Sequence, residues 1–329
     1  MLSRAAEALF WIGRYAERAE DTARLLDVHF HQIIIDPAVD EAETCAVVAT
    51  VMGLRDGGPD PVPTTMREVL DLLAYDLDNP SAIAGALAAA RENARGVRES
   101  LSGEIWECLN TTYLELPRRI SAARQFGPAP LCSYVRHRAA MYAGYVVSTI
   151  SRDAGYDFLA LGRSLERADM TARLLAAAVG TPAREDDHWV TTLRACSAHE
   201  AYLRRYRRGV AGRPVLEFLL LDRQFPRSVL HALTVGEQAL ARLEPAGQSD
   251  GQSDGRPGRA SEARRLIGRV RTDLEFLSPE VLAHGLPERL QSIQRGVSDV
   301  SESVGRRYFG SSTLVGWNRE EADWIGATP

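Results

Sequence analysis

Arginine and glutamate recur at the same spacing in two stretches of the chain. Residues 13–26 read GRYAERAEDTARLL and residues 162–175 read GRSLERADMTARLL, so ten of fourteen positions are identical. The planar guanidinium of arginine binds carboxylate or phosphate through two parallel hydrogen bonds. The charged candidates in the two copies are Arg14, Glu17, Arg18 and Arg24, and Arg163, Glu166, Arg167, Asp169 and Arg173.

These charges have three interpretations. They can form a solvated helix face joined by ion pairs of a few tenths of a kcal/mol each. They can form a buried arginine–carboxylate network that fixes the architecture. They can also bind a ligand, and we include Asp222 and Arg227 from a later repeated segment in the same candidate set. The halves have diverged elsewhere, whereas Arg, Glu, Arg, Thr and Arg of the repeated phrase kept their register, which weakens the first interpretation.

A second group of basic residues, Arg204, Arg205 and Arg207, is interleaved with Tyr202 and Tyr206. Basic and aromatic side chains in alternation can contact RNA or a nucleotide phosphate. The alternative is an amphipathic helix with tyrosines toward the core and arginines in water. The net charge of −5 argues against nucleic acid as a partner.

Residue patterns for other chemistry are weak. His29 and His31 are two residues apart and diverge on a helix, so they are poor joint metal ligands. The single Glu185-to-His188 spacing lacks the second motif of a di-iron bundle, and we expect no metal. The four cysteines form no CxxC pair and are expected to be buried thiols in a reducing cytoplasm.

All 39 basic residues are arginine, because the sequence contains no lysine. A P-loop or Schiff-base lysine therefore cannot come from this chain. No stretch of about 18 apolar residues is present, and Ser3 is expected to cap a helix with no leader segment ahead of it. We therefore expect a cytoplasmic protein without membrane spans.

Apolar residues follow the helical period almost everywhere, which predicts an all-α fold. On a helical wheel, Leu9, Ile12 and Ala16 begin a core stripe in the first copy, and Phe158 and Leu161 begin one in the second. The alanines that continue both stripes predict a close helix–helix approach. The expected helices are 3–35, 40–53, 64–76, 80–101, 103–126, 131–151, 155–180, 186–209, 213–221, 226–244, 259–276 and 279–308.

The two copies lie 149 residues apart, at 13 and 162, and a second matching block lies 146 apart, at 73 and 219. This order predicts an internally duplicated helical bundle whose two similar halves, 1–150 and 151–329, pack together. Gly-, Ser- and charge-rich sequence predicts a mobile loop at 245–259 in the second half.

The chain resembles the bacterial alpha-E family over essentially its whole length. Phe10 stands where the family commonly has tyrosine, and the GQSD repeat in 247–254 is an insertion. The segments that carry the resemblance are Leu2-Ser3-Arg4-Ala5-Ala6-Glu7, Gly13-Arg14, Glu17-Arg18-Ala19-Glu20, Gly162-Arg163, Glu166-Arg167-Ala168-Asp169-Met170-Thr171-Ala172-Arg173, Phe218-Leu219-Leu220-Leu221-Asp222 and Phe225-Pro226-Arg227-Ser228-Val229.

The resemblance implies a duplicated all-helical protein encoded beside, or fused to, a circularly permuted ATP-grasp ligase, often with a transglutaminase-like protease. Such clusters are expected to make and remodel amide bonds on small peptides. The implied role is a non-ATP-binding accessory subunit that binds a peptide or amino-acid acceptor, with ATP and magnesium on the partner. The alternatives are a structural or interaction module and a tRNA-binding module.

Overall fold

Helices make up the part of the chain that the structure describes. The computed structural model describes residues 1–54, 62–180, 187–244, 261–277 and 285–309, and no strand occurs among them. The all-α prediction is therefore confirmed, whereas the predicted loop at 245–259 lies outside the described residues. The elements are α1 (Ser3–Ile35), α2 (Glu41–Met52), α3 (Met66–Leu70), η1 (Asp71–Tyr75), α4 (Ile83–Gly96), η2 (Arg98–Ser100), α5 (Gly103–Phe126), α6 (Ala129–Thr149), α7 (Ala154–Gly180), α8 (Asp187–Ala195), α9 (His199–Tyr206), α10 (Gly212–Leu221), α11 (Val229–Leu243), α12 (Glu262–Glu275), α13 (Leu286–Val304) and η4 (Gly305–Phe309).

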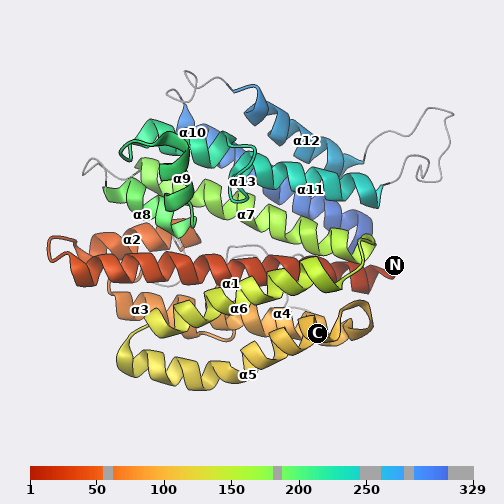
Figure 1. The fold of residues 1–329 in the computed structure, drawn as a ribbon, viewed down its shortest axis with the longest axis horizontal. Helices are drawn as coiled ribbons and strands as arrows, with labels where there is room; N and C mark the ends of the chain where they lie inside the picture. The colour runs from red at the N-terminus through yellow and green to blue at the C-terminus, as the bar shows by residue number, and fades with distance from the viewer. Residues whose placement is uncertain (55–61, 181–186, 245–260, 278–284, 310–329) are drawn as a thin grey trace, which may run out of the picture.

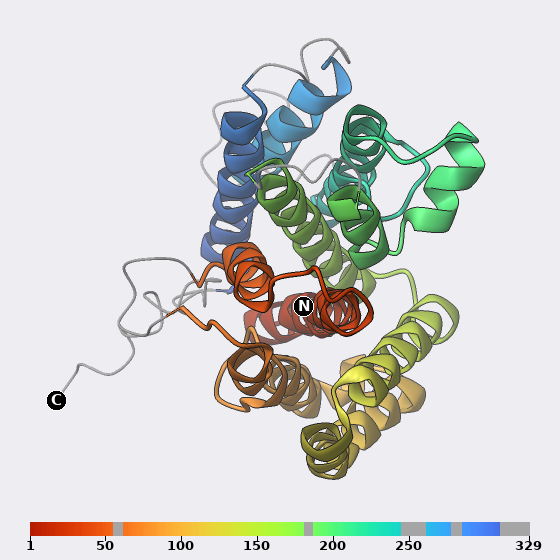
Figure 2. The ribbon, with the colours of Figure 1, turned by 90° about the vertical axis from the view of Figure 1, so that its left-hand side faces the viewer.

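The long helices α1 and α7 form the centre of the molecule. They run side by side in the same direction, and each carries one copy of the repeated phrase (Figure 1). Helices α4 and α6 pack against α1, whereas α11 and α13 pack against α7. Seen along the helix axes, α1 lies between the two groups (Figure 2).

Each central helix also contacts a helix from the other side of the molecule. Helix α2 follows α1 in sequence but packs against α7, and α8 follows α7 but packs against α1. One hydrophobic cluster consequently extends from Ala6 to Phe309 through both groups of helices.

The predicted core stripes are confirmed. Leu9, Ile12, Phe158 and Leu161 are at most 2% exposed, and the alanines that follow them in both stripes are buried. The opposite face of α1 is buried as well, because α7 covers it. The wheel alone therefore gave only half of the buried surface of this helix.

The two central helices approach most closely at the glycines that begin the repeated phrase. A Cβ atom on Gly13 would collide with the carbonyl oxygen of Leu159, and one on Gly162 would collide with that of Phe10. Glycine is required at both positions because backbone fills the space that a side chain would need.

Some helix limits differ from the prediction. The single helix expected at 186–209 is wrong, because the chain breaks between α8 and α9, where Ser197 has φ 53°. The helix expected at 64–76 changes to π geometry after Leu70. Ser3 is the first helical residue and not the cap, which is Leu2 without a side-chain hydrogen bond.

Within the described residues, no helix combines the length and the apolar character that crossing a bilayer requires.

Candidate functional site

Two ion pairs join the central helices in a reciprocal arrangement. Arg18 Nε on α1 lies 2.6 Å from Glu166 Oε1 on α7, and Arg167 Nε on α7 lies 2.6 Å from Glu17 Oε1 on α1. Each pair joins a residue of the adjacent Glu17-Arg18 in the first copy to a residue of the adjacent Glu166-Arg167 in the second copy. Because α1 and α7 are parallel and cross at their glycines, each glutamate faces the arginine of the opposite copy.

This contact is closed to solvent at its centre. The side chains of Arg18 and Glu166 are both 0% exposed, and that of Glu17 is 3% exposed. The solvated-face interpretation is therefore wrong for these residues. A buried ion pair requires good geometry and further hydrogen bonds to offset the loss of hydration.

Arg14 adds a second positive charge to Glu166. Its Nε lies 2.5 Å from Glu166 Oε2, and its Nη1 donates to Ser301 Oγ on α13 at 2.9 Å. Arg163 has the corresponding position on α7 but makes no hydrogen bond or ion pair with any described residue. It acts on the site at longer range, since its charge is among those that lower the pKa of Glu17.

Arg227 supplies the second positive charge to Glu17. Its Nη1 lies 2.9 Å from Glu17 Oε1 and its Nη2 lies 2.9 Å from Glu20 Oε1, while Nη1 also donates to Asp21 Oδ1. A single guanidinium thus bridges three carboxylates on consecutive turns of α1.

Local structure holds Arg227 in place. It precedes Ser228, whose side chain caps the start of α11 by accepting from the backbone N–H of His231. The carbonyl of Arg227 accepts a hydrogen bond from Thr171 Oγ1 at 2.9 Å. The equivalent contact on α1 joins the aligned residues: Thr22 Oγ1 donates a hydrogen bond to the carbonyl of Ser81.

The charges in this site shift the acids in opposite directions. Burial alone would raise the pKa of Glu17, but the charges of Arg167 and Arg227 outweigh it and bring the pKa to about 2. Burial raises the pKa of Asp21 to about 8, because the nearby Glu17 and Glu20 add to the desolvation and Arg227 only partly offsets them. Burial opposes ionisation of Glu166 too, yet Arg14 and Arg18 lower its pKa.

Arg24 and Arg173 do not cross between the helices. Arg24 Nη2 pairs with Glu20 Oε1 at 2.6 Å, and Arg173 Nε pairs with Asp169 Oδ2 at 2.9 Å, each one turn along its own helix. Asp169 Oδ1 is buried and accepts no hydrogen bond.

Asp222, predicted as a ligand-binding or network residue, lies outside this network and lines a separate pocket. Its Oδ1 accepts from the backbone N–H groups of Gln224 and Phe225 at 2.8 Å each, which shapes the loop after α10. The sequence analysis, conversely, omitted Glu20, Asp21 and Ser301 from its candidates. The sequence did contain a signal for Asp21. When the two repeats are aligned, Asp21 is matched by Met170, and its partner Arg227 is matched by Ser81, so both members of this pair differ between the copies.

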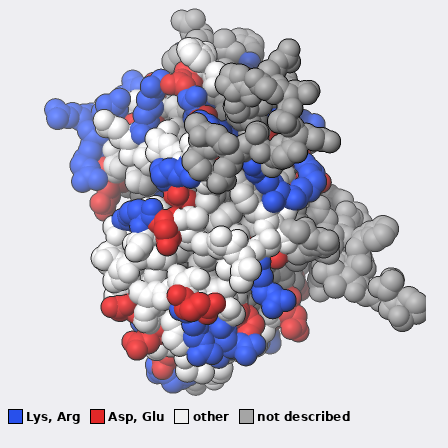
Figure 3. Space-filling view, turned by 90° about the vertical axis from the view of Figure 1, so that its right-hand side faces the viewer, with Lys and Arg blue, Asp and Glu red and all other residues white. Residues whose placement is uncertain are grey.

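The second basic group lies on α9 and just after it. Arg204, Arg205 and Arg207 are exposed, whereas Tyr202 is 0% exposed and stacks on Tyr206 with ring centroids 4.8 Å apart. Tyr202 therefore presents no face to a base. On the opposite side of the molecule from α9, the face shown in Figure 3 carries both acidic and basic side chains around an uncharged area.

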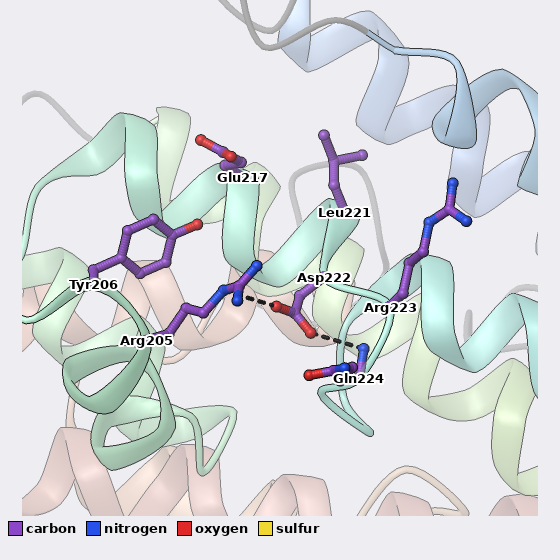
Figure 4. Close-up of a pocket in the computed structure, with 7 residues that line it drawn as sticks. All are labelled: Arg205, Tyr206, Glu217, Leu221, Asp222, Arg223 and Gln224. Carbon is purple, nitrogen blue, oxygen red and sulfur yellow. Dashed lines mark hydrogen bonds and ion pairs between the residues drawn. The ribbon is translucent and has the colours of Figure 1, made fainter.

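A pocket of about 370 Å³ opens beside this group. It is lined by residues of α9, α10 and the loop after α10 (Figure 4), namely Arg205, Tyr206, Glu217, Leu221, Asp222, Arg223 and Gln224.

Among the histidines and cysteines, Cys196 lies close to the Arg–Glu network, where the charges of Arg227 and Asp21 act on its thiol, and His231 Nδ1 contacts the carbonyl of Arg223 at 2.9 Å. His29 is buried and its Nδ1 contacts the Leu25 carbonyl at 2.8 Å, so it does not face His31. All four cysteines are buried, as expected, and burial raises the pKa of Cys196 to about 12. Among the described residues, no three His, Cys, Asp or Glu side chains gather to hold a metal ion; Glu185 lies outside them.

The fold and the site define a class of all-helical proteins in which two parallel helices are joined by buried, reciprocal Glu–Arg pairs. The chain belongs to the Alpha-E family, described as a predicted alpha-helical domain with a conserved ER motif, whose model matches residues 1–309. Adjacent Glu-Arg occurs in both copies of the repeated phrase, as Glu17-Arg18 and Glu166-Arg167.

Similar chains are found in mycobacteria. An uncharacterized protein of Mycobacterium bovis and one of Mycobacterium tuberculosis strain H37Rv are each 28% identical to this chain over 318 residues. The match covers 89% of this chain but only 35% of each relative, so the chain spans about a third of their length. No solved structure matches the chain.

Proposed function

We propose that this chain is a partner-dependent subunit of an ATP-grasp system that forms amide or peptide bonds. One observation carries the proposal: the mycobacterial relatives contain the matching region as about a third, 35%, of a longer chain. A domain that is joined to further sequence in its relatives is expected to work beside a second component. Family membership supports the identity proposed for that component, an ATP-grasp enzyme, often accompanied by a transglutaminase-like protease.

The proposed division of labour follows from the side chains available. The partner brings ATP, magnesium and the lysines that hold phosphates, since all 39 basic residues of this chain are arginine. This chain contributes the surface on which the partner docks and the site for the amino-acid or peptide acceptor. It carries no nucleotide of its own in this proposal.

We assign the buried Arg–Glu network to architecture and not to acceptor binding. The side chains of Arg18 and Glu166 are 0% exposed, so a substrate could reach them only if α1 and α7 separated. The acceptor site of the proposal must lie elsewhere on the molecule, where charged side chains are accessible.

We further propose that the halves 1–150 and 151–329 arose by duplication. Equivalent neighbours support this: α4 and α6 flank α1 as α11 and α13 flank α7, and α2 and α8 each cross to the opposite central helix. The reciprocal pairs Arg18–Glu166 and Arg167–Glu17 have the same relation.

Co-expression with an ATP-grasp protein, which the family resemblance predicts to be encoded beside this chain, tests the proposal. A tag on this chain should recover both proteins as a stable complex, and ADP formation with an amino-acid acceptor should require both chains. The ligase alone is the matched control. Full amide-forming activity of the ligase without this chain would overturn the proposal.

A structural or interaction module is the second candidate, because α5 and α6 expose apolar side chains. Leu114 is 64% exposed, Val147 55% and Met141 43%. A module of this kind would bind the same partner but leave ADP formation unchanged when it is omitted, so the same assay separates the two functions.

A further inference from the structure

The pocket beside α9 contains charged side chains that are not firmly paired with the other residues that line it. Asp222 is engaged with the backbone of its loop through Oδ1, and Arg223 Nη2 pairs with Glu275 Oε1 on α12 at 2.9 Å. Arg205, in contrast, is 66% exposed and lies only loosely beside Asp222, with Nε 3.8 Å from Oδ2. Its guanidinium is therefore available to another anion.

Glu217 is the available negative charge. It is half-buried on α10 and makes no hydrogen bond or ion pair with any described residue. The Tyr206 hydroxyl also has no hydrogen-bond partner among them. Burial, with the charge of Glu217 adding to it, raises the pKa of Tyr206 to about 12, so this hydroxyl stays protonated beside the carboxylate.

The aromatic wall of the pocket is held in position before any ligand binds. The ring of Tyr206 stacks on Tyr202 and lies edge-on to Phe218, with ring centroids 4.8 and 6.1 Å apart. Leu221, one turn after Glu217 on α10, adds an apolar side chain to the lining (Figure 4). A pre-formed pocket lowers the ordering cost that binding must overcome.

We infer that this pocket binds a free α-amino acid in its zwitterionic form. Glu217 accepts the α-ammonium group, Arg205 takes the carboxylate through charge-assisted hydrogen bonds, and the Tyr206 hydroxyl donates to the same carboxylate. Leu221 contacts the side chain. A phosphate fits poorly, because Glu217 and Asp222 repel a ligand that carries only negative charge.

The inference deepens the proposed function, on which it rests for its biological meaning: the pocket is where the acceptor of the amide-forming reaction is held. Its chemistry, however, concerns this chain alone. Binding is therefore measured without the partner, and the two proposals fail separately. A complex without amino-acid binding would remove the pocket assignment only, and binding without a complex would remove the partnership only.

Isothermal titration of the full chain with L-leucine is the first experiment, with N-acetyl-L-leucine and L-leucinamide as analogues that each lack one charge. We expect L-leucine to bind with a Kd of about 1 mM or tighter, and each analogue to bind at least about tenfold more weakly. Equal binding of either analogue, preferential binding of inorganic phosphate, or no binding of any natural amino acid would overturn the inference.

Variants place the binding at this pocket. Glu217→Gln and Arg205→Gln should each weaken L-leucine binding about tenfold, and Tyr206→Phe should weaken it less. Arg204→Gln is the matched control, because Arg204 lies beside Arg205 on α9, is exposed and does not line the pocket. Circular dichroism shows whether each variant is folded, and unchanged binding in folded Glu217→Gln would contradict the assignment.

Discussion

The two copies of the repeated phrase share their central ion pairs but differ in what surrounds them. Around Glu17, Arg227 adds a charge that also reaches Glu20 and Asp21. At the equivalent place beside the second copy, Ser81 aligns with Arg227 and Met170 aligns with Asp21. A charged pair in one copy is thus matched by a neutral pair in the other.

The difference shows which part of the site tolerates change. The reciprocal pairs Arg18–Glu166 and Arg167–Glu17 each depend on both helices, so a change in either residue removes one of the charges that stabilise its buried partner. The flanking residues differ together, because losing Arg227 alone would leave the buried Asp21 carboxyl without the donor that hydrogen-bonds to it. The four predictions below test this comparison, beginning with the largest expected effect.

Replacing the central glutamates should have unequal costs. Glu166→Gln removes the carboxylate that pairs with both Arg14 and Arg18 and should lower the free energy of unfolding by about 3–5 kcal/mol. Glu17→Gln should lower the free energy of unfolding by less, because Arg227 remains in contact with the carboxyl groups of Glu20 and Asp21. Urea denaturation measures the free energy of unfolding of both variants. Glu115→Gln, which breaks an exposed ion pair with Arg118, is the control and should stay within about 1 kcal/mol of wild type. Equal costs for the two central glutamates would contradict the comparison.

The glycine contact should be equally sensitive from both sides. Gly13→Ala and Gly162→Ala each place a methyl group against backbone of the other helix and should cost about 1–3 kcal/mol or more. In Gly144→Ala the new methyl group meets open space on α6, and better helix propensity should stabilise by about 0.5–1 kcal/mol. Thermal unfolding distinguishes them, and a harmless Gly162→Ala would show that the helices lie further apart.

Transplanting the neutral pair tests the coupling of the flanking residues. Arg227→Ser and Asp21→Met should each destabilise the protein, whereas the double variant should lose less than the two costs added. We expect an interaction free energy of about 1–3 kcal/mol in a double-mutant cycle measured by denaturation. Strict additivity would mean that the two differences between the copies arose independently.

The pH dependence should isolate Asp21. Its folded pKa of about 8 lies above the ordinary value of 3.8 for an aspartate, so the unfolded chain loses this proton first and stability falls as pH rises through about 4 to 8. Glu17, with a pKa of about 2, changes stability only in more acidic solution. Asp21→Asn should therefore reduce the fall in Tm between pH 5 and pH 8 by roughly a few degrees. Exposed Glu104→Gln is the control, and an unchanged profile in Asp21→Asn would show that Asp21 is ionised in the fold.

Sequence periodicity predicted the fold class and the core stripes because a helix buries one face at a fixed angular spacing. It could not predict the break at Ser197, where neither glycine nor proline marks the turn. It placed Glu17 and Arg18 among the candidates but could not pair them, since each partner lies about 150 residues away on a parallel helix. The pocket was missed for a similar reason, because Glu217 and Tyr206 come together only when α9 folds back beside α10.

The crossing of α2 to α7 and of α8 to α1 has a consequence for how the chain can be divided. A polypeptide ending near residue 150 would keep α2 but lose the helix that α2 covers, and α1 would lose both α7 and α8. The turn between α6 and α7 is exposed at residues 151–154, so a cut there removes no buried contact. Two separately expressed fragments should therefore each be unstable alone and recover the native structure when mixed, as in fragment complementation.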